Sequence, residues 1–337
     1  MEFKVGRQII GRGNPSFVIA EIGINHEGSV EACAKMIRAA AEAGADAVKL
    51  QTVDPEENYA PGTESHAIFS QAELTREETA RMFELARQLG LEVFTTAGDF
   101  NTLEWVEALE PSAHKISSGL LTSTPIIRAA AKTGRPLLMS TGMAETEAID
   151  RAVEAAKEAG CQALALFQCT SIYPAPPETL NLRTIGWLEE RYGIPCGFSD
   201  HSRGIQAAPL AVAAGASMIE KHFSLDLGRE GFDHRLSLSP EDFAEMVNGI
   251  RSAEAMLGTP EKSLATEEQV NAGKYHRVLA ARRDVDTGKI LGRDDVAVLR
   301  LAPGSGGLEP GRFESLMGKR ALVALKRFSP IREEDVE

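Results

Sequence analysis

Short apolar runs alternate with helix-like segments rich in Ala, Leu and Glu along the part of the chain that precedes Gly258. Eight such runs occur, at residues 17–22, 47–50, 92–96, 113–116, 137–140, 163–167, 194–198 and 217–219. Each lies beside a helix-like segment, and brief apolar runs in that setting are typical of buried parallel strands. Eight strand–helix units in this order predict an α/β fold, a (β/α)8 TIM barrel.

Polar residues close each apolar run. In a (β/α)8 barrel the loops that follow the strands meet at one mouth, which carries the catalytic groups, while the opposite face stabilises the fold. The side chains expected around this mouth are Glu21, Lys49, Gln51, Thr95, Thr96, Lys115, Ser117, Ser118, Ser140, Thr141, Gln168, Cys169, Ser199, Asp200, His201, Glu220, Lys221 and His222. The pattern therefore predicts a single cavity lined by lysines, carboxylates, hydroxyls and imidazoles.

The strand–helix rhythm ends at residue 258, after a last barrel helix near 241–257. From His276 onward, β-like runs at 278–281, 296–299 and 321–325 are separated by Asp-Thr-Gly-Lys and by the Gly/Pro-rich PGSGGLEPG. We therefore expect a barrel over 1–258, a polar linker over 259–275 and a small β-rich domain over 276–337. A unit this small is marginally stable alone, so we expect it to dock on something.

Charge and composition limit the classes of binding partner and the cellular location that we expect. A net charge of −13 argues against nucleic acid, whose phosphates need a basic surface, although a local basic pocket for a small anion stays compatible with it. The sequence contains no run of about 20 apolar residues, so it does not predict a membrane span. The first residues lack a signal-peptide pattern, and the four cysteines lack CxxC spacing, so we expect a cytoplasmic protein with reduced thiols.

Two histidines suggest a metal site. His201 and His222 follow the seventh and eighth strands, which are neighbours when a barrel closes. Neutral imidazoles there, with water and substrate oxygens, form an open site for Mn²⁺, Mg²⁺ or Zn²⁺. The alternative is that both histidines are structural.

Two lysines suggest a complementary anion site. Lys49 and Lys115 follow the second and fourth strands, where their ammonium groups, with Thr96, Ser118 and Ser140, suit a phosphate or a carboxylate. The alternative is that both lysines are solvated or paired for structural reasons.

Seven motifs, in order, resemble those of the sialic acid synthases. They are AEIGINHEG (20–28), VKLQT (48–52), HKISSG (114–119), STGMA (140–144), QCTSIYPAPPE (168–178), GFSDHS (197–202) and IEKHFSLD (219–226). The segments GKYHRVLAARRDVDTGKIL and LMGKRALVALKRFSPI resemble the C-terminal SAF domain of these enzymes, an antifreeze-like β-clip unit. These nonulosonic acid synthases condense phosphoenolpyruvate with an N-acetylated hexose, N-acetylmannosamine or a diacetamido relative, and water, and release phosphate.

The resemblance implies a role for particular residues. His201 and His222 match the ligands of a divalent metal, Mn²⁺ or Mg²⁺. The positions that match the phosphoenolpyruvate contacts are Lys49, Thr96, Lys115, Ser118, Ser140 and Ser199, and those that match the acceptor contacts are Glu21, Gln51, Tyr173 and Asp233. Glu21 either transfers a proton or orients the sugar. Asp200 either orients His201 or caps the following helix. The family also implies a domain-swapped homodimer, in which the SAF domain of one subunit caps its partner's barrel.

Three positions depart from the family pattern. Ala302 stands where many bacterial members carry an arginine that reaches the partner's site. Either Arg300, two residues earlier, substitutes for that arginine, or the contact is absent. Phe232 replaces a proline, and Ser171 replaces an asparagine. These changes leave the acceptor open. Two other functions also stay open: a different condensation of phosphoenolpyruvate with a sugar phosphate, of the deoxy-octulosonate phosphate type, and non-catalytic carbohydrate binding.

Overall fold

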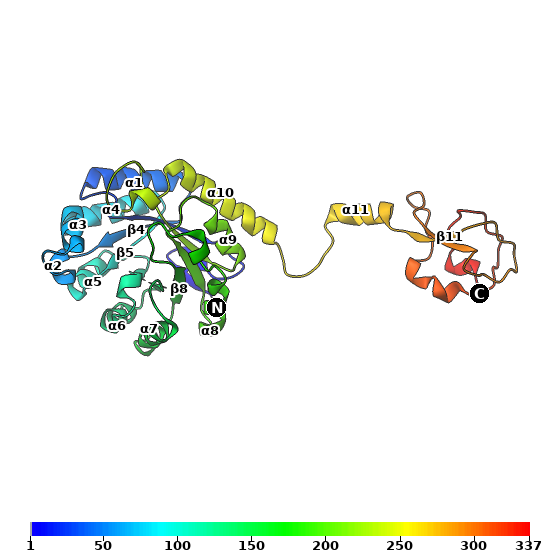
Figure 1. Cartoon of the computed structure of the whole chain (residues 1–337), viewed down its shortest axis with the longest axis horizontal. Helices are drawn as coiled ribbons and strands as arrows, with labels where there is room; N and C mark the ends of the chain where they lie inside the picture. The colour runs from blue at the N-terminus through cyan, green and yellow to red at the C-terminus, as the bar shows by residue number, and fades with distance from the viewer. Residues whose placement is uncertain (1) are drawn as a thin grey trace. The chain divides into compact units, whose positions relative to one another are not determined.

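The computed structural model describes residues 2–337, which form two compact units that meet in sequence at Gly258 and Thr259. The first unit contains a closed barrel of parallel strands in the order β10-β3-β4-β5-β6-β7-β8-β9 (Figure 1). These strands are β3 (Phe17–Gly23), β4 (Ala47–Thr52), β5 (Glu92–Ala97), β6 (His114–Ile116), β7 (Leu137–Ser140), β8 (Leu164–Cys169), β9 (Cys196–Asp200) and β10 (Met218–His222). The predicted (β/α)8 barrel is confirmed.

Helices surround the barrel (Figure 1), and the longer ones bury apolar residues in the core between helices and strands. They are α1 (Val30–Glu42), α4 (Arg76–Gln88), α5 (Phe100–Glu107), α6 (Thr124–Lys132), α7 (Thr146–Glu158), α8 (Thr184–Tyr192), α9 (Ala207–Ala213) and α10 (Pro240–Leu257), with α2 (Pro55–Asn58) and α3 (Glu64–Ala72) inserted after β4. Helix α6, for example, buries Ile126, Ile127, Ala130 and Ala131, the spacing of a helical stripe. The start of α4 is fixed by a capping box between Thr75 and Glu78.

The unit has a core on each side of the strands. One lies between the strands and the helices, and a smaller one fills the barrel interior around Phe17, Phe94 and Phe167. A hairpin of β1 (Phe3–Val5) and β2 (Gln8–Ile10) adds Val5 and Ile10 to the interior core. The hairpin therefore closes the barrel at the amino ends of the strands, opposite the mouth. The sequence did not predict it.

The second unit is small and has its own core. It contains α11 (Thr266–Tyr275) and an antiparallel pair, β11 (Val278–Ala281) with β12 (Val296–Leu299), packed around buried residues such as Leu279, Leu316 and Ile331. Helix α11 occupies most of the segment that we expected to be a linker, and none of its residues is buried.

The strand predicted at residues 321–325 is wrong. Ala321 makes a single bridge with Val336, and Leu325 makes another with Val285. Because neighbouring residues pair with different segments, the backbone bonds are satisfied without a continuous ladder.

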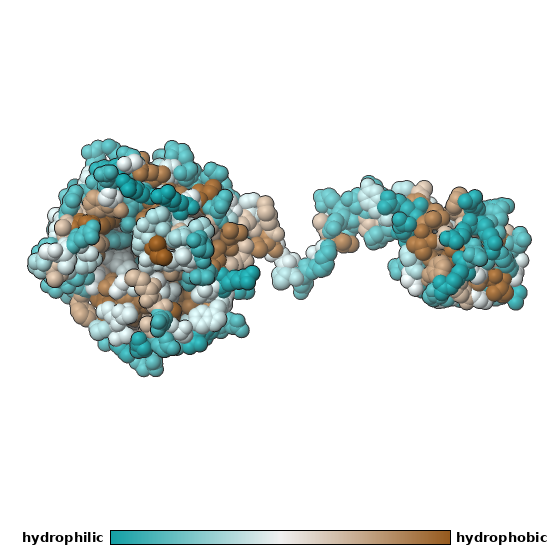
Figure 2. Space-filling view, in the orientation of Figure 1, coloured by the Kyte–Doolittle hydropathy of each residue, from teal (hydrophilic) through white to brown (hydrophobic). Residues whose placement is uncertain are grey.

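The surface of the visible face is mostly hydrophilic on both units, with apolar side chains in separate patches (Figure 2). Within residues 2–337, no helix is long and apolar enough to cross a membrane.

Candidate active site

A cavity of about 540 Å³ lies at the carboxyl ends of the barrel strands. The predicted site residues that line it are Glu21, Lys49, Gln51, Thr96, Lys115, Ser118, Ser140, Tyr173, Ser199, His201, His222 and Asp233. Arg300 belongs to the second unit, where its guanidinium stacks on the Tyr275 ring at 4.9 Å and donates to the Tyr275 carbonyl. The structure thus brings the lysines and the imidazoles into one pocket.

The two lysines are buried and paired with carboxylates. Lys49 Nζ lies 2.9 Å from Glu21 Oε2 and 3.8 Å from Glu220 Oε2, while Lys115 Nζ lies 3.6 Å from Glu220 Oε1. Each side chain is at most 5% exposed, which excludes the alternative of solvated lysines. Buried charges need partners of this kind, because desolvation of an isolated charge is very costly.

The same burial separates the acidities of the two carboxylates. Desolvation raises the pKa of Glu21 to about 7, against the opposing effect of Lys49. Desolvation acts on Glu220 in the same sense, but Lys115 and Lys49 together lower its pKa to about 2. Two neighbouring acids with such different pKa values mark a site suited to proton transfer, with Glu21 able to exchange a proton near neutral pH.

Hydroxyl groups surround the lysines. Lys115 Nζ donates to Ser140 Oγ at 2.6 Å, and Ser199 Oγ donates to Glu220 Oε1 at 2.9 Å. Thr96 Oγ1 is buried and has no hydrogen-bond partner within residues 2–337. An unpaired buried hydroxyl is destabilising, so a ligand that accepts its hydrogen bond is favoured here.

A second group of hydroxyls gathers at Gly142. Its backbone N–H donates to Ser118 Oγ at 3.0 Å, and the nearby Ser171 Oγ is buried without a partner in the described chain. A Cβ at position 142 would collide with Ser171 Oγ and Ser118 Oγ, so any residue other than glycine would displace these hydroxyls. The close approach places the Ser171 hydroxyl, which has no partner in the described chain, where an anion can accept its hydrogen bond.

The two imidazoles lie side by side, with ring centroids 5.4 Å apart, and Tyr173 stacks on His201 at 4.3 Å. His201 Nδ1 lies 2.8 Å from the Thr170 carbonyl, to which only an N–H can donate, so Nε2 is left as a ligand atom. His222 Nδ1 is buried without a hydrogen-bond partner among the described residues, and Asp233 Oδ2 lies 3.5 Å away.

These donors fit a divalent cation. Burial lowers the pKa of His222 well below its ordinary value, which keeps that imidazole neutral, the form that binds metals. Residues 2–337 contain no group of three or more His, Cys, Asp or Glu side chains arranged as a complete metal site. Water and substrate oxygens would therefore complete the coordination, as in open catalytic sites.

Several residues expected around the mouth face away from it. Lys221 Nζ donates to Asp200 Oδ2 at 2.9 Å, and Asp200 Oδ1 accepts from the backbone N–H of Ser202 at 2.8 Å. Both alternatives for Asp200 are therefore wrong: it does not bond to the His201 ring, and the N-cap of α9 is Gln206. Thr95, Thr141 and Gln168 likewise bond to backbone carbonyls. The reason is that successive strand residues point to opposite faces.

The sequence pattern assigns no role to Glu220, which pairs with both lysines. It also does not predict that Asn58, Tyr59, Phe69 and Met143 form a wall of the pocket. Three of these wall residues come from the α2–α3 insertion. An unusually long segment between the second strand and its helix was the available signal, because insertions at that end of a barrel line the mouth.

A parallel (β/α)8 barrel whose mouth buries paired lysines and carboxylates beside two imidazoles defines an enzyme of the TIM-barrel class. The sequence matches the NeuB family over residues 36–262 and the SAF domain over residues 276–337. The chain therefore belongs to the NeuB family, the sialic and nonulosonic acid synthases, which are phosphoenolpyruvate-dependent enzymes, and it carries a C-terminal SAF domain.

Individual relatives agree over almost the whole chain. It is 32% identical to the N,N'-diacetyllegionaminic acid synthase of Legionella pneumophila over 345 residues, 97% of this chain and 96% of that protein. It is also 32% identical to the N-acetylneuraminate-9-phosphate synthase of Mus musculus, over 100% of this chain and 97% of that protein. The crystal structure of N-acetylneuraminic acid synthetase from Leptospira borgpetersenii, in complex with citrate, superposes with a TM-score of 0.77 at 32% identity, covering 80% of this chain and 95% of that one.

Proposed function

We propose that this protein condenses phosphoenolpyruvate with an N-acetylated hexose, N-acetylmannosamine or a diacetamido relative, and water. The products are a nine-carbon keto acid of the sialic acid type and inorganic phosphate. The observation that carries the proposal is the single pocket in which the buried side chains of Lys49 and Lys115 lie beside His201 and His222. We also place the reaction in the cytoplasm, on the basis of the family.

The lysines and hydroxyls form the donor half of the site. We assign phosphoenolpyruvate to Lys49, Thr96, Lys115, Ser118, Ser140 and Ser199. Ammonium groups held out of water interact strongly with a phosphate or a carboxylate, and they need no reorganisation when charge develops during the reaction. The unpaired Thr96 hydroxyl supports the assignment, because a bound anion supplies the missing acceptor.

The acceptor half is formed by Glu21, Gln51, Tyr173 and Asp233. Gln51 Nε2 donates to Glu21 Oε1 at 2.7 Å and so orients this carboxyl group. C3 of phosphoenolpyruvate bonds to the aldehyde carbon of the open-chain sugar, water adds at C2, and the resulting tetrahedral carbon releases phosphate. Glu21, with its pKa raised to about 7, takes the role of proton donor or acceptor in this sequence.

His201 and His222 would hold Mn²⁺ or Mg²⁺. When bound, the ion supplies Lewis acidity to the sugar aldehyde. A His201→Ala variant tests the assignment: metal content measured by mass spectrometry and turnover should both fall. Unchanged metal content with unchanged turnover would exclude the metal role.

The SAF unit is proposed to cap the mouth of a partner barrel in a domain-swapped homodimer, and Arg300 is proposed to approach the acceptor in that arrangement. Exposed apolar side chains near the pocket support a cap, since Met143 is 75% exposed and Tyr173 is 52% exposed. Light scattering should give the mass of a dimer. An Arg300→Ala variant should raise the KM for the acceptor and leave dimer formation intact, whereas a monomeric active protein would contradict the arrangement.

Phosphate release from phosphoenolpyruvate tests the reaction itself. The assay uses a panel of N-acetyl and diacetamido hexoses, each free and as its 6-phosphate, with Mn²⁺ or Mg²⁺. We expect release with at least one N-acetylated hexose. Release with a non-acetylated sugar phosphate alone would identify a different condensing synthase, and binding without release would identify a non-catalytic protein.

A further inference from the structure

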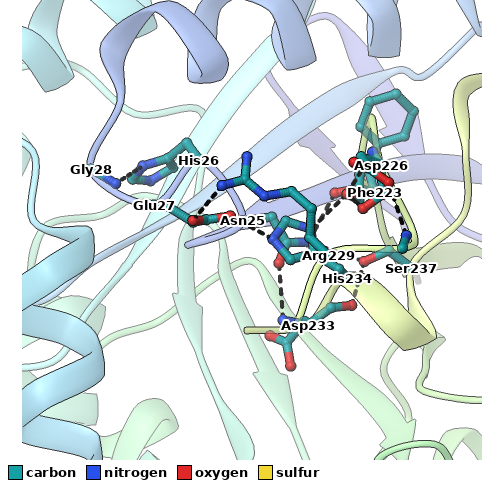
Figure 3. Close-up of polar contacts among 12 residues, drawn as sticks. Asn25, His26, Glu27, Gly28, Phe223, Asp226, Arg229, Asp233, His234 and Ser237 are labelled. Atoms are coloured by element: carbon teal, nitrogen blue, oxygen red, sulfur yellow. Dashed lines mark hydrogen bonds and ion pairs between the residues drawn. The ribbon is translucent and has the colours of Figure 1, made fainter. Parts of the chain in front are cut away.

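Two loops that are distant in sequence are joined beside the mouth of the barrel (Figure 3). The first follows β3 and contains Asn25 and Glu27, and the second follows β10 and contains Arg229 and His234. Glu27 Oε1 lies 2.9 Å from His234 Nε2, and Glu27 Oε2 accepts from Arg229 Nη2 at 2.8 Å. The His234 side chain is 1% exposed and that of Glu27 is 16% exposed, so their contact is partly buried.

The joined loops fix the backbone of Asp233. Its N–H donates to Asn25 Oδ1 at 3.0 Å, and its carbonyl accepts from Ser237 Oγ at 2.7 Å. Asn25 Nδ2 donates in turn to Ser237 Oγ at 3.0 Å and to the Phe223 carbonyl at 3.0 Å. Figure 3 shows these contacts around the backbone of Asp233, while its carboxylate extends away from them.

The carboxylate of Asp233 is held by no hydrogen bond within the described chain and lines the cavity. His222 Nδ1 lies 3.5 Å from Oδ2, beyond the range of a normal hydrogen bond, so the direction of the carboxylate depends mainly on the backbone. The backbone in turn depends on His234, the next residue, whose Nδ1 lies 2.7 Å from Ser224 Oγ and whose Nε2 contacts Glu27. A hydroxyl at Nδ1 and a carboxylate at Nε2 leave this ring a single orientation.

Both loops contain a residue in an unfavourable backbone conformation. Glu27 has φ +51° and Phe232 has φ +46°, the left-handed region that residues with a Cβ seldom adopt. Such conformations persist where surrounding contacts impose them, and they gather at ligand-binding sites. Here Glu27 makes the contact that joins the two loops, and Phe232 lies two residues before its partner, His234.

We propose that Glu27 and His234 form a positioning pair that aims the Asp233 carboxylate at the acceptor sugar. This inference rests on the proposed function, because it takes Asp233 as an acceptor contact. Arg229 reaches Glu27 from a half-exposed position and adds an ion pair of the weak, solvent-screened kind. The contact between Glu27 and the buried His234 ring is the element on which the direction of the Asp233 carboxylate depends.

A Glu27→Ala variant tests the pair. It should raise the KM for the acceptor about tenfold, the usual effect of losing a hydrogen bond to a charged group, and leave the KM for phosphoenolpyruvate unchanged. Glu27→Gln keeps an oxygen that accepts from His234 Nε2, so it should restore most of the acceptor affinity although it loses the ion pair with Arg229.

The chain provides a closely matched control. Glu107 also contacts a buried histidine and an arginine, with 2.8 Å to His114 Nε2 and 2.6 Å to Arg135 Nε, and it does not line the pocket. Glu107→Ala should therefore lower thermal stability without changing the KM for the acceptor. This comparison separates positioning from general loosening of the fold.

Amide hydrogen exchange gives a readout that needs no turnover. The amides of residues 226–237 should exchange faster in Glu27→Ala than in the wild type, and at the wild-type rate in Glu107→Ala. Unchanged exchange in Glu27→Ala would overturn the proposal. So would equal rises in both KM values or an unchanged acceptor KM. If the wild type condenses no sugar, the proposed function fails, while the exchange comparison still decides whether the pair fixes the loop.

Discussion

Single residues set the charge balance of the pocket, and Glu220 is central to it. Its two oxygens lie within 4 Å of Lys49 and Lys115, and Ser199 donates to it. Burial lowers the pKa of Lys115, and the charge of Glu220 is the largest opposing influence. Glu220 therefore keeps Lys115 protonated, and so able to bind an anion.

A Glu220→Gln variant should bind phosphoenolpyruvate more weakly, and in a pH-dependent way. Without the opposing charge, the pKa of Lys115 falls further, so the lysine deprotonates as the pH rises through a lower value than in the wild type. Calorimetric titration from about pH 6 to about pH 9 should show affinity lost at lower pH in the variant. Identical pH profiles would contradict this account, and Glu189→Gln, which disrupts only a surface ion pair with Arg12, is the control.

The site could be predicted from the sequence as far as the strand ends, but not to the individual side chain. Glu220, Lys221 and His222 all follow the same apolar run, yet Lys221 faces away and pairs with Asp200. Successive side chains of a strand point to opposite faces, but this rule identifies the ones that face the pocket only when the end of the strand is known. The apolar run stops at Ile219, so the pattern predicts that the strand ends there. The strand instead continues to His222, because its charged residues are paired with buried partners.

Among the elements, the hairpin of β1 and β2 shows why short strands escape sequence patterns. Each has three residues, too few for a periodicity, and each buries only its last side chain, Val5 or Ile10. The long barrel strands are predictable because both faces are buried, which makes them almost continuously apolar. The segment 321–325 has the composition of a strand, but its pairing is set by distant segments.

Ile10→Ala should destabilise the barrel without affecting substrate binding. Ile10 is 1% exposed in the interior core, so its truncation should lower the free energy of unfolding by about 3 kcal/mol. The KM values should not change, since the hairpin lies at the face opposite the mouth. Chemical denaturation and steady-state kinetics test both statements. Ile9→Ala, at a side chain that is 42% exposed, should lower the free energy of unfolding much less. Equal losses in the two variants would show that burial of Ile10 in the interior core does not stabilise the barrel.

At the scale of the whole molecule, the chain divides into two units with separate cores, which meet in sequence after Gly258. The smaller unit can bury only a small apolar core, and contacts to a buried carboxylate, Asp295, add to its stability. Asp295 accepts from Arg283 Nε at 2.7 Å, from Lys289 Nζ at 2.6 Å and from the backbone N–H of Gly292 at 3.0 Å. All these contacts lie within the segment that connects β11 with β12, so they stabilise its conformation.

Asp295 should make the stability of the second unit depend on acidic pH. Burial alone would raise its pKa, but Lys289, the Gly292 N–H and Arg283 together lower it from 3.8 to about 2. Since the folded state then binds a proton more weakly than the unfolded state, the stabilisation is complete above about pH 4 and is lost as the pH falls towards 2. Asp295→Asn should remove this pH dependence and lower the free energy of unfolding by about 2 kcal/mol at neutral pH.

Hydrogen exchange in β11 and β12 measures the change, with the barrel amides as an internal reference. Equal pH dependence in the variant and the wild type would show that these contacts do not stabilise the unit.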